Sequence, residues 1–345
     1  MTGGITSPDH GWRQADHGPA TQRTTKRRRR GGGRGRGEVA MVDDVEFTSY
    51  YGRQIVKTPV WKSPDVPLYL FLGGAAGSSS ILAAIADLTD RPTLTRVGRI
   101  TAGGGAILSV VALVHDLGRP ERFLHMLRVF KVTSPLSVGT YILSPFSAAA
   151  GATAAVEILG WFPRLKRFGG VVSALFGGPL ATYTGVLLAN TAVPSWHAAH
   201  TQLPFVFGGS GMAAGGGISM IFTPVDEAGP ARKMAVAGAA IELAVVHKVE
   251  NDHGILSEPY HEGRPGKFMR AAKACTAAGA GLTVLAGRRR WGAVASGTLL
   301  AAGSLLTRFG VFEAGIASTK DPKYVVIPQR ERMAAANGQA RSVTR

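Results

Sequence analysis

The chain contains eight apolar stretches, each about long enough to cross a bilayer, and short basic loops separate most of them. They cover residues 66–86, 97–115, 138–160, 169–190, 202–222, 231–248, 270–287 and 291–309. A membrane-spanning helix needs roughly 20 mostly apolar residues, because its backbone must satisfy its own hydrogen bonds inside the hydrocarbon. The sequence therefore predicts an all-α integral membrane protein with a bundle of eight transmembrane helices. We expect these eight helices to form two four-helix halves.

Polar segments flank the apolar region on both sides. We expect a membrane domain over residues 65–311, a juxtamembrane segment over 41–64 and a polar tail over 312–345. Residues 1–40 are rich in Gly and Arg and lack apolar periodicity, which predicts a disordered basic tail. Residues 37–41 can be encoded by a purine-rich sequence that resembles a ribosome-binding site before a start codon, so we hypothesise that translation starts at Met41. The alternative is a genuine basic tail that touches anionic lipid.

The formal net charge of +17 reflects membrane topology better than nucleic-acid binding, because most basic residues outside the first forty lie in loops that flank apolar stretches. The loops after the first, third, fifth and seventh stretches are shorter and more basic than the others. The positive-inside rule then places them in the cytoplasm and both termini outside. The high content of Ala, Gly and Arg fits a bacterium with a GC-rich genome. Together with the predicted spans, this indicates a multi-pass protein of the bacterial inner membrane.

The connection after the second stretch, residues 115–123, combines a turn with charges of both signs. Gly118 and Pro120 are suited to a turn that leaves the helix. A surface loop of mixed charge is suited to docking a soluble subunit. The alternative is a helix cap followed by an interfacial amphipathic turn. The candidate docking residues in this loop are Asp116, Arg119, Glu121 and Arg122.

This loop, together with residues 67–74 and 183–188, closely resembles the polysulfide reductase/NrfD family, over roughly residues 50 to 320. The resemblance implies an eight-span membrane subunit of a molybdopterin oxidoreductase complex. It implies a chain that exchanges electrons between membrane quinone, menaquinone or ubiquinone, and a ferredoxin-like iron–sulfur subunit, which serves a molybdopterin catalytic subunit. We therefore expect no haem or iron–sulfur cluster in this chain. The single Cys275 agrees with this, because it excludes an intrachain disulfide and a cluster held by the chain's own cysteines.

Quinone chemistry moves two electrons and two protons, so its site needs polar partners for two ring oxygens, an apolar slot and a proton exit. Asp65 and Tyr69 are four residues apart and share a face where the first span begins. Tyr183 lies in the fourth span, after a Gly-Gly-Pro sequence that can open a slot. The family resemblance implies a quinone beside the beginning of the first span and a tyrosine of the fourth. We therefore predict that Asp65, Tyr69 and Tyr183 form the quinone site.

Each of these residues also has a structural interpretation. Tyr69 is suited to the aromatic belt at the membrane interface, and Asp65 to capping the first span or to its first turn. Tyr183 can instead make a hydrogen bond between helices.

Two further residues are candidates for a proton path. Glu242 lies inside the sixth span among Ala and Val, where an ionisable side chain is costly. His115 ends the second span, where it can relay protons or merely cap the helix. A polar contact between helices is the alternative for Glu242. Glu157, near the end of the third span, is explained by exposure at the interface.

Residues that follow even-numbered spans extend the predicted docking surface. Trp196 and His197 follow the fourth span, and a polar segment, 250–262, follows the sixth. With the 115–123 loop, they predict a surface that docks the iron–sulfur subunit. The alternative is an ordinary solvated set of loops.

Two other functions compete with the quinone-reactive subunit. Spans broken by glycine and proline are typical of transporters with a central substrate site, and a purely structural anchor would leave electrons to its partners. A haem anchor is disfavoured because, of the histidines outside the tail, only His247 is plausibly placed inside a span. The pairs Gly73 with Gly77 and Gly211 with Gly215 predict close helix packing by the small-xxx-small rule.

Overall fold

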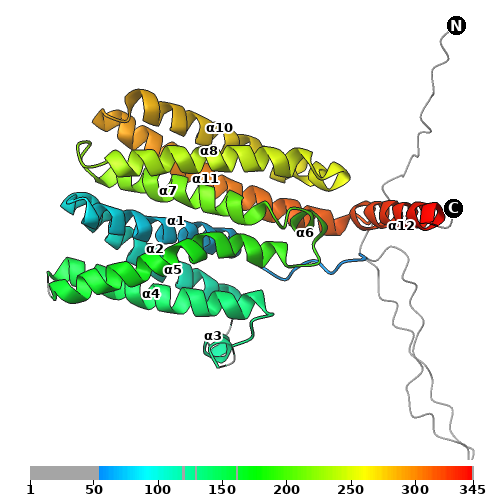
Figure 1. Cartoon of the computed structure of the whole chain (residues 1–345), viewed down its shortest axis with the longest axis horizontal. Helices are drawn as coiled ribbons and strands as arrows, with labels where there is room; N and C mark the ends of the chain where they lie inside the picture. Colours follow the sequence, from blue (N-terminus) through cyan, green and yellow to red (C-terminus); the bar gives the residue numbers. More distant parts are fainter. Residues whose placement is uncertain (1–53, 119–120, 129, 161, 344–345) are drawn as a thin grey trace, which may run out of the picture. The chain divides into compact units, whose positions relative to one another are not determined.

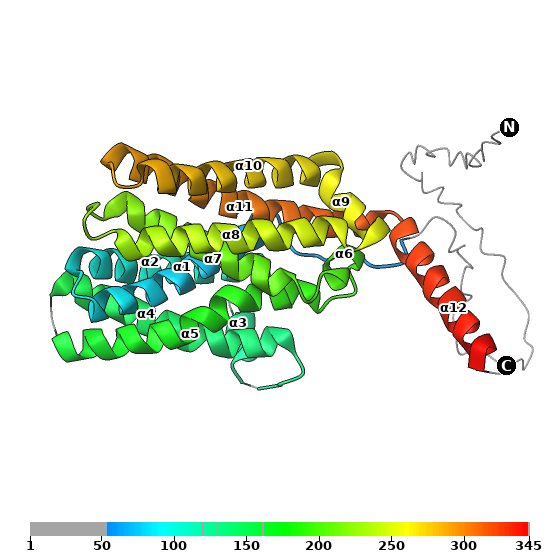
Figure 2. The same ribbon diagram turned by 45° about the horizontal axis from the view of Figure 1, so that its top comes forward.

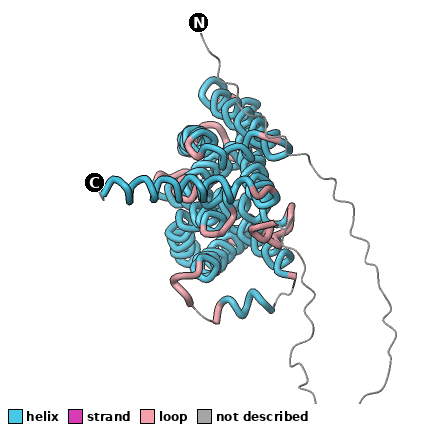
Figure 3. Tube along the Cα trace, turned by 90° about the vertical axis from the view of Figure 1, so that its right-hand side faces the viewer, coloured by secondary structure: helices cyan, strands magenta, loops and turns pink. Residues whose placement is uncertain are grey.

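The computed structural model describes residues 54–343 except 119–120, 129 and 161, and it describes no side chains for residues 122–124 and 336–343. The described residues belong to one compact unit. The predictions for residues 1–40, for Met41, for Arg119 and for the side chain of Arg122 lie outside the described part. All regular secondary structure in the described residues is helical (Figure 3), which confirms the predicted all-α class.

Long helices lie side by side in the bundle (Figures 1 and 2). Each predicted apolar stretch lies within one of these helices, apart from at most one residue at an end. They are α1 (Asp65–Leu88), α2 (Pro92–Leu117), α4 (Pro135–Leu159), α5 (Pro163–Ala189), α7 (Leu203–Phe222), α8 (Gly229–Asn251), α10 (Gly263–Ala286) and α11 (Arg290–Lys320). The short elements are α3 (Glu121–Met126), α6 (Pro194–Ala198), η1 (Gly254–Ser257) and α9 (Glu258–His261), and α12 (Lys323–Val343) follows the bundle.

Among the described residues, six helices are long and apolar enough to cross a membrane: α1, α2, α4, α5, α7 and α11. The prediction of eight spans is confirmed for these six. Helices α8 and α10 form where spans were predicted, but they carry more charge than the others. Helix α8 has charged residues near both ends and Glu242 in its interior. Helix α10 has four basic residues in its first half.

Small residues bring α1 close to its neighbours at the centre of the bundle. A side chain on Gly77 would collide with the backbone of Gly177 in α5, and side chains on Gly211 and Gly215 would press on the α1 backbone. The predicted small-xxx-small packing is therefore confirmed for Gly77, Gly211 and Gly215, with α5 and α7 as the partners of α1. It is not seen at Gly73, where an added Cβ would make only an ordinary contact with Ser109.

The bundle has two ends, which we name after residues at each. The Asp65 end holds the beginning of α1 and the ends of α2 and α5, and α12 leaves the bundle there (Figure 2). The Arg99 end holds the turns between α1 and α2 and between α4 and α5. Helix α11 continues to Lys320 at the Asp65 end, so the domain boundary predicted at residue 311 falls inside a continuous helix.

Candidate functional site

Tyr69 and Tyr183, both predicted from the sequence, line one cavity between α1, α2, α4 and α5. Both tyrosines come from helices that meet at the Gly77–Gly177 contact, which brings α1 and α5 together. Tyr69 is buried, so the interpretation as an interfacial belt residue is wrong. The rest of the wall is largely apolar and includes Leu113, Met126, Leu136, Leu143, Leu180 and Leu187.

The ring of Tyr183 lies directly against Gly139 of α4, and its hydroxyl donates a hydrogen bond to the carbonyl oxygen of Pro135. The hydrogen bond between helices that the sequence offered as an alternative therefore exists. It does not exclude a role in binding, because the same ring forms part of the cavity wall. Gly139 is a site residue that sequence reasoning missed, since a glycine in an apolar span carries no signal of what faces it.

The cavity has a volume of about 50 Å³, whereas pockets for small molecules usually measure ~300–1,000 Å³. A quinone ring therefore fits only if side chains move. Polar side-chain atoms in the wall come from the two tyrosines and from Ser109, Thr140 and Thr184. Polar groups in an apolar slot match the chemistry of a quinone, whose ring is apolar apart from its two oxygens.

Asp65 and His115 pair with each other at the Asp65 end. Asp65 is in the first turn of α1, as one sequence interpretation had it, and its Oδ2 lies 2.8 Å from Nδ1 of His115 at the end of α2. The His115 side chain is 73% exposed and that of Asp65 only 18%. Neither residue lines the cavity, but Asp65 lies one turn before Tyr69. Asp65 thus lies near the cavity, and His115 lies on the surface of the chain.

Glu242 is buried between α8, α10 and α11, where it is 2% exposed. Its carboxylate accepts hydrogen bonds from Thr307 Oγ1 at 2.5 Å and from Thr276 Oγ1 at 3.5 Å. This geometry agrees with both interpretations of Glu242, a polar contact between helices and a place on a proton path.

Arg308, in α11, is 0% exposed and was missed by sequence reasoning. The last predicted stretch ends at residue 309, so Arg308 falls at its end and the sequence gives no signal that it is buried. Because α11 continues for more than ten further residues, Arg308 lies deep in the bundle instead.

The predicted docking residues fall into three groups. Glu121 and His197 are exposed at the Asp65 end, and Asp116 there accepts a hydrogen bond from the backbone N–H of Lys62 at 3.0 Å. Trp196 is 0% exposed, so its side chain does not contribute to a docking surface. It stacks on Trp61 with ring centroids 5.7 Å apart, and its Nε1 donates to the carbonyl of Val311 at 2.7 Å. The prediction for Trp196 was wrong because a tryptophan in a short loop helix can pack inward.

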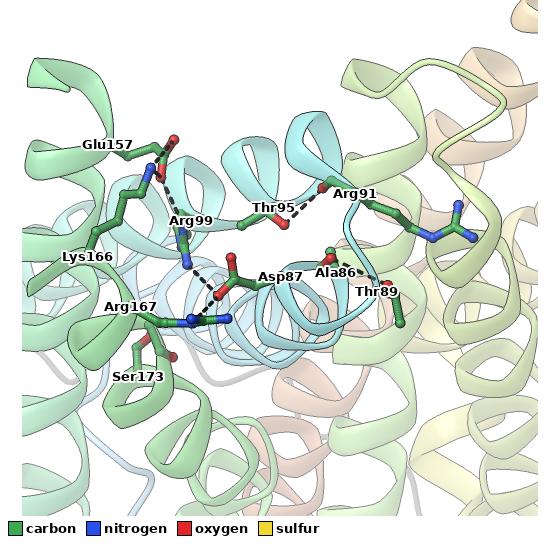
Figure 4. A network of polar contacts seen from close by, with 11 residues as sticks. Ala86, Asp87, Thr89, Arg91, Thr95, Arg99, Glu157, Lys166, Arg167 and Ser173 are labelled. Atoms are coloured by element: carbon green, nitrogen blue, oxygen red, sulfur yellow. Dashed lines mark hydrogen bonds and ion pairs between the residues drawn. The ribbon is translucent and has the colours of Figure 1, made fainter. Parts of the chain in front are cut away.

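A charged network closes the Arg99 end (Figure 4). The guanidinium of Arg99 lies 3.3 Å from Asp87 in α1 and 3.0 Å from Glu157 in α4. Lys166 also pairs with Glu157, and Arg167 with Asp87, both from α5. The Glu157 side chain is 11% exposed, so exposure at the interface does not explain it. The network joins α1, α2, α4 and α5 at one end of the cavity-bearing helices.

Comparison with known proteins identifies one family. The sequence pattern of the family described as "Polysulphide reductase, NrfD" matches residues 54–243, which is more than half of the chain. The match includes both tyrosines, the Asp65–His115 pair and Glu242, and it ends before α10 and α11. A search of curated proteins found no match.

Proposed function

The chain belongs to the NrfD polysulphide reductase family, and on this premise we propose that it is the quinone-reactive membrane subunit of a respiratory molybdopterin oxidoreductase. Membership makes it an integral membrane subunit of a reductase-type complex. The proposal adds the task of the subunit: exchange of electrons between membrane quinone, menaquinone or ubiquinone, and an iron–sulfur partner. The clusters and the molybdopterin belong to the partners, and this chain holds no haem.

The observation that carries the proposal is the position of Tyr69 and Tyr183 in one apolar cavity. The two residues are more than one hundred positions apart in the sequence, yet both line the same wall. Tyrosine hydroxyls donate and accept hydrogen bonds, so the pair is suited to the two oxygens of a quinone ring. Binding of the ring requires Tyr183 to leave the Pro135 carbonyl, which enlarges the cavity and frees its hydroxyl for the ligand.

The protons of quinone chemistry need an exit, and Asp65 with His115 supplies one. Asp65 begins α1 one turn before Tyr69, and the imidazole of His115 reaches the surface. A carboxylate and an imidazole in hydrogen-bond contact can pass a proton between them. In this proposal, the pair moves protons between the neighbourhood of the cavity and water at the Asp65 end.

We also propose that the iron–sulfur partner docks at the Asp65 end, because electrons must enter close to the cavity. Asp116, Glu121 and His197 lie at this end and contribute to the proposed surface, and the sequence predicts that Arg119 and Arg122 do so too. In the same proposal, α8 and α10 complete an eight-span bundle. Their charged residues lie mainly toward their ends, where long basic side chains can reach the membrane surface.

Replacement of Tyr183 by Phe tests the proposal. Tyr183→Phe keeps the ring and removes the hydroxyl, so we expect the complex to assemble and its quinone turnover to fall at least roughly tenfold. The matched control is Tyr141→Phe. Tyr141 also donates to a backbone carbonyl, that of Leu127, but it does not line the cavity.

Both variants are purified with their partners from native membranes, and quinone reduction is driven with a reduced viologen dye. Co-purification of an iron–sulfur subunit reports assembly. Unchanged turnover in Tyr183→Phe would point to a purely structural anchor. Purification of the wild-type chain without redox partners would favour a transporter.

A further inference from the structure

We propose that Glu242 and Arg308 form a proton-exchange site among α7, α8, α10 and α11, which protons reach from the Asp65 end through Glu250 and Lys273. This site is separate from the quinone cavity, which lies among α1, α2, α4 and α5. Its four ionisable groups come from α8, α10 and α11, and three of them lie outside the region that matches the family.

Arg308 is the first observation. Its Nη2 donates to the carbonyl oxygen of Phe207 at 2.9 Å, and its guanidinium lies 4.1 Å from the centre of the Phe207 ring. Its Nε and Nη1 are buried and have no hydrogen-bond partner among the described residues. A buried cation with unsatisfied donors is costly, so such a group inside a membrane bundle indicates a site that binds something. Water and a nearby negative charge are the species that would satisfy these donors.

Glu242 supplies the negative charge. The elements around its carboxylate contribute hydroxyl groups, from Ser210 of α7, Thr276 of α10 and Thr307 of α11, and Arg308 is the charged group that acts on it. The described contacts include no direct ion pair between Glu242 and Arg308, but Thr307, which donates to Glu242, directly precedes Arg308 in α11. A carboxyl group in this setting can bind or release a proton without losing its hydroxyl partners.

The route to the surface follows the contact between α8 and α10. Glu250 lies eight residues after Glu242 on α8, about 12 Å along the helix and on the same face. It is buried, and its Oε2 pairs with Nζ of Lys273 at 2.6 Å, while its Oε1 is buried without a partner. Lys273 is 37% exposed and precedes Thr276 by three residues, so the two share one face of α10.

Between the two carboxylates lies Val246, which is buried. Proton transfer across this turn therefore needs water to enter between α8 and α10. Lys273 and Glu250 form the outer part of the route, and Thr276 and Glu242 the inner part.

Helix α1 alone separates this site from the quinone cavity. Gly73 lines the cavity, and its neighbour Gly74 faces Nη2 of Arg308, 3.0 Å from the position that a Cβ would take. A charge that develops in the cavity therefore acts on Arg308 and Glu242 across about one helix diameter of low-dielectric protein. In the proposed step, a proton from water binds the Glu242 carboxylate when negative charge enters the cavity, and it leaves when that charge is neutralised. This coupling rests on the proposed quinone function, whereas proton exchange at Glu242 does not.

The first experiment uses the purified full chain in detergent, without partners or quinone. Infrared difference spectra across a pH titration should show a protonated-carboxyl band that is lost in Glu242→Gln and kept in the control Glu157→Gln. Lys273→Met should slow hydrogen–deuterium exchange of that band at least tenfold. A band unaffected by Glu242→Gln, or exchange at the wild-type rate in Lys273→Met, overturns the proposal. If Glu242→Gln does not accumulate, Glu242→Asp decides the question, because a shifted band supports the site and an unshifted band overturns it.

The second experiment measures proton uptake and quinone turnover together in the complex, reconstituted into vesicles with a pH dye inside. We expect Glu242→Gln to keep quinone turnover within twofold of wild type. It should lose the transient proton uptake that accompanies entry of negative charge into the cavity and is reversed when that charge is neutralised. Tyr183→Phe should lose turnover. If Glu242→Gln keeps the full transient proton uptake, the coupling is overturned. If Tyr183→Phe keeps normal turnover, the proposed quinone function fails instead.

Discussion

The ring of Tyr183 occupies the space that a side chain on Gly139 would need. Helices α4 and α5 can approach this closely only because residue 139 has no Cβ. The position of the Tyr183 hydroxyl in the cavity wall is therefore decided by a residue on another helix.

This relationship predicts that Gly139→Ala impairs quinone turnover although it removes no polar group. The added methyl group must push the Tyr183 ring away from α4, and a displaced hydroxyl no longer meets a quinone oxygen. We expect a loss comparable to that of Tyr183→Phe. The control is Gly151→Ala on the same helix, where the new methyl group meets open space. Equal turnover in the two alanine variants would show that Tyr183 is not held by Gly139.

A second prediction concerns the Asp65–His115 pair. Its histidine is largely exposed, so loss of the pair should cost at most about 1 kcal/mol of stability. If the pair carries protons, Asp65→Asn and His115→Gln should each slow quinone turnover roughly tenfold, and the double variant should be little slower than either. Steady-state turnover of the three complexes measures this. Additive losses would mean that the two residues act separately.

The Arg99 network predicts a large effect on stability. Arg99 is buried and holds Asp87 and Glu157 from two other helices (Figure 4). Arg99→Met removes the buried cation shared by the two carboxylates, which keep only the more exposed Lys166 and Arg167. This should destabilise the protein by roughly 2–3 kcal/mol. Arg96→Met is the control, because Arg96 is exposed on the same helix. Apparent melting temperatures in detergent compare the two, and equal values would contradict a stabilising role for the network.

Glu227 caps helix α2 from the loop between α7 and α8. Its carboxylate accepts hydrogen bonds from the backbone N–H groups of Thr93 at 2.8 Å and Leu94 at 3.1 Å, and from the Thr93 hydroxyl at 2.7 Å. Burial works to raise the pKa of Glu227, but these bonds outweigh it and hold the pKa below its ordinary value.

We expect Glu227→Ala to cost about 0.5–2 kcal/mol, as loss of a helix cap usually does. Since the pKa is lowered, the contribution is complete above the ordinary carboxyl pKa and disappears as the pH falls through the folded value. Asp226→Ala, at the exposed neighbouring acid, is the control. Thermal unfolding of both variants at neutral pH measures the difference.

The attachment of α12 should depend on pH. Lys323 Nζ lies 2.8 Å from Glu258 Oε1, and this hydrogen bond lowers the pKa of Glu258 and raises that of Lys323. The pair is therefore intact between about pH 5 and pH 10, is lost in acid as Glu258 is protonated, and is lost in alkali as Lys323 is deprotonated. Both side chains are about one-third exposed, so the effect stays below about 1 kcal/mol.

A spin label at Met333→Cys, in a Cys275→Ser background, reports the mobility of α12. We expect mobility to be constant near neutral pH and to rise in acid. Lys323→Met should raise mobility at neutral pH and remove the acid step, whereas the control Lys320→Met should behave like the parent. An acid step that persists in Lys323→Met would assign it to another group.

The sequence determined the helical membrane fold, because the length and apolarity of a span are local properties that the bilayer selects directly. It also identified Tyr69, Tyr183, Asp65, His115 and Glu242, since polar residues at the ends or inside apolar spans stand out. The structure brings the first two together in one cavity and the next two into one pair.

Only the tertiary structure decided what surrounds each residue. Arg308 is a deep cation because α11 is longer than its apolar stretch, Trp196 is buried because it packs on Trp61, and Gly139 matters because of the ring on α5. These outcomes depend on contacts between helices distant in sequence, and no local pattern records which helix faces which. The local sequence decides which segments insert into the membrane, whereas contacts between helices decide the chemistry of the site.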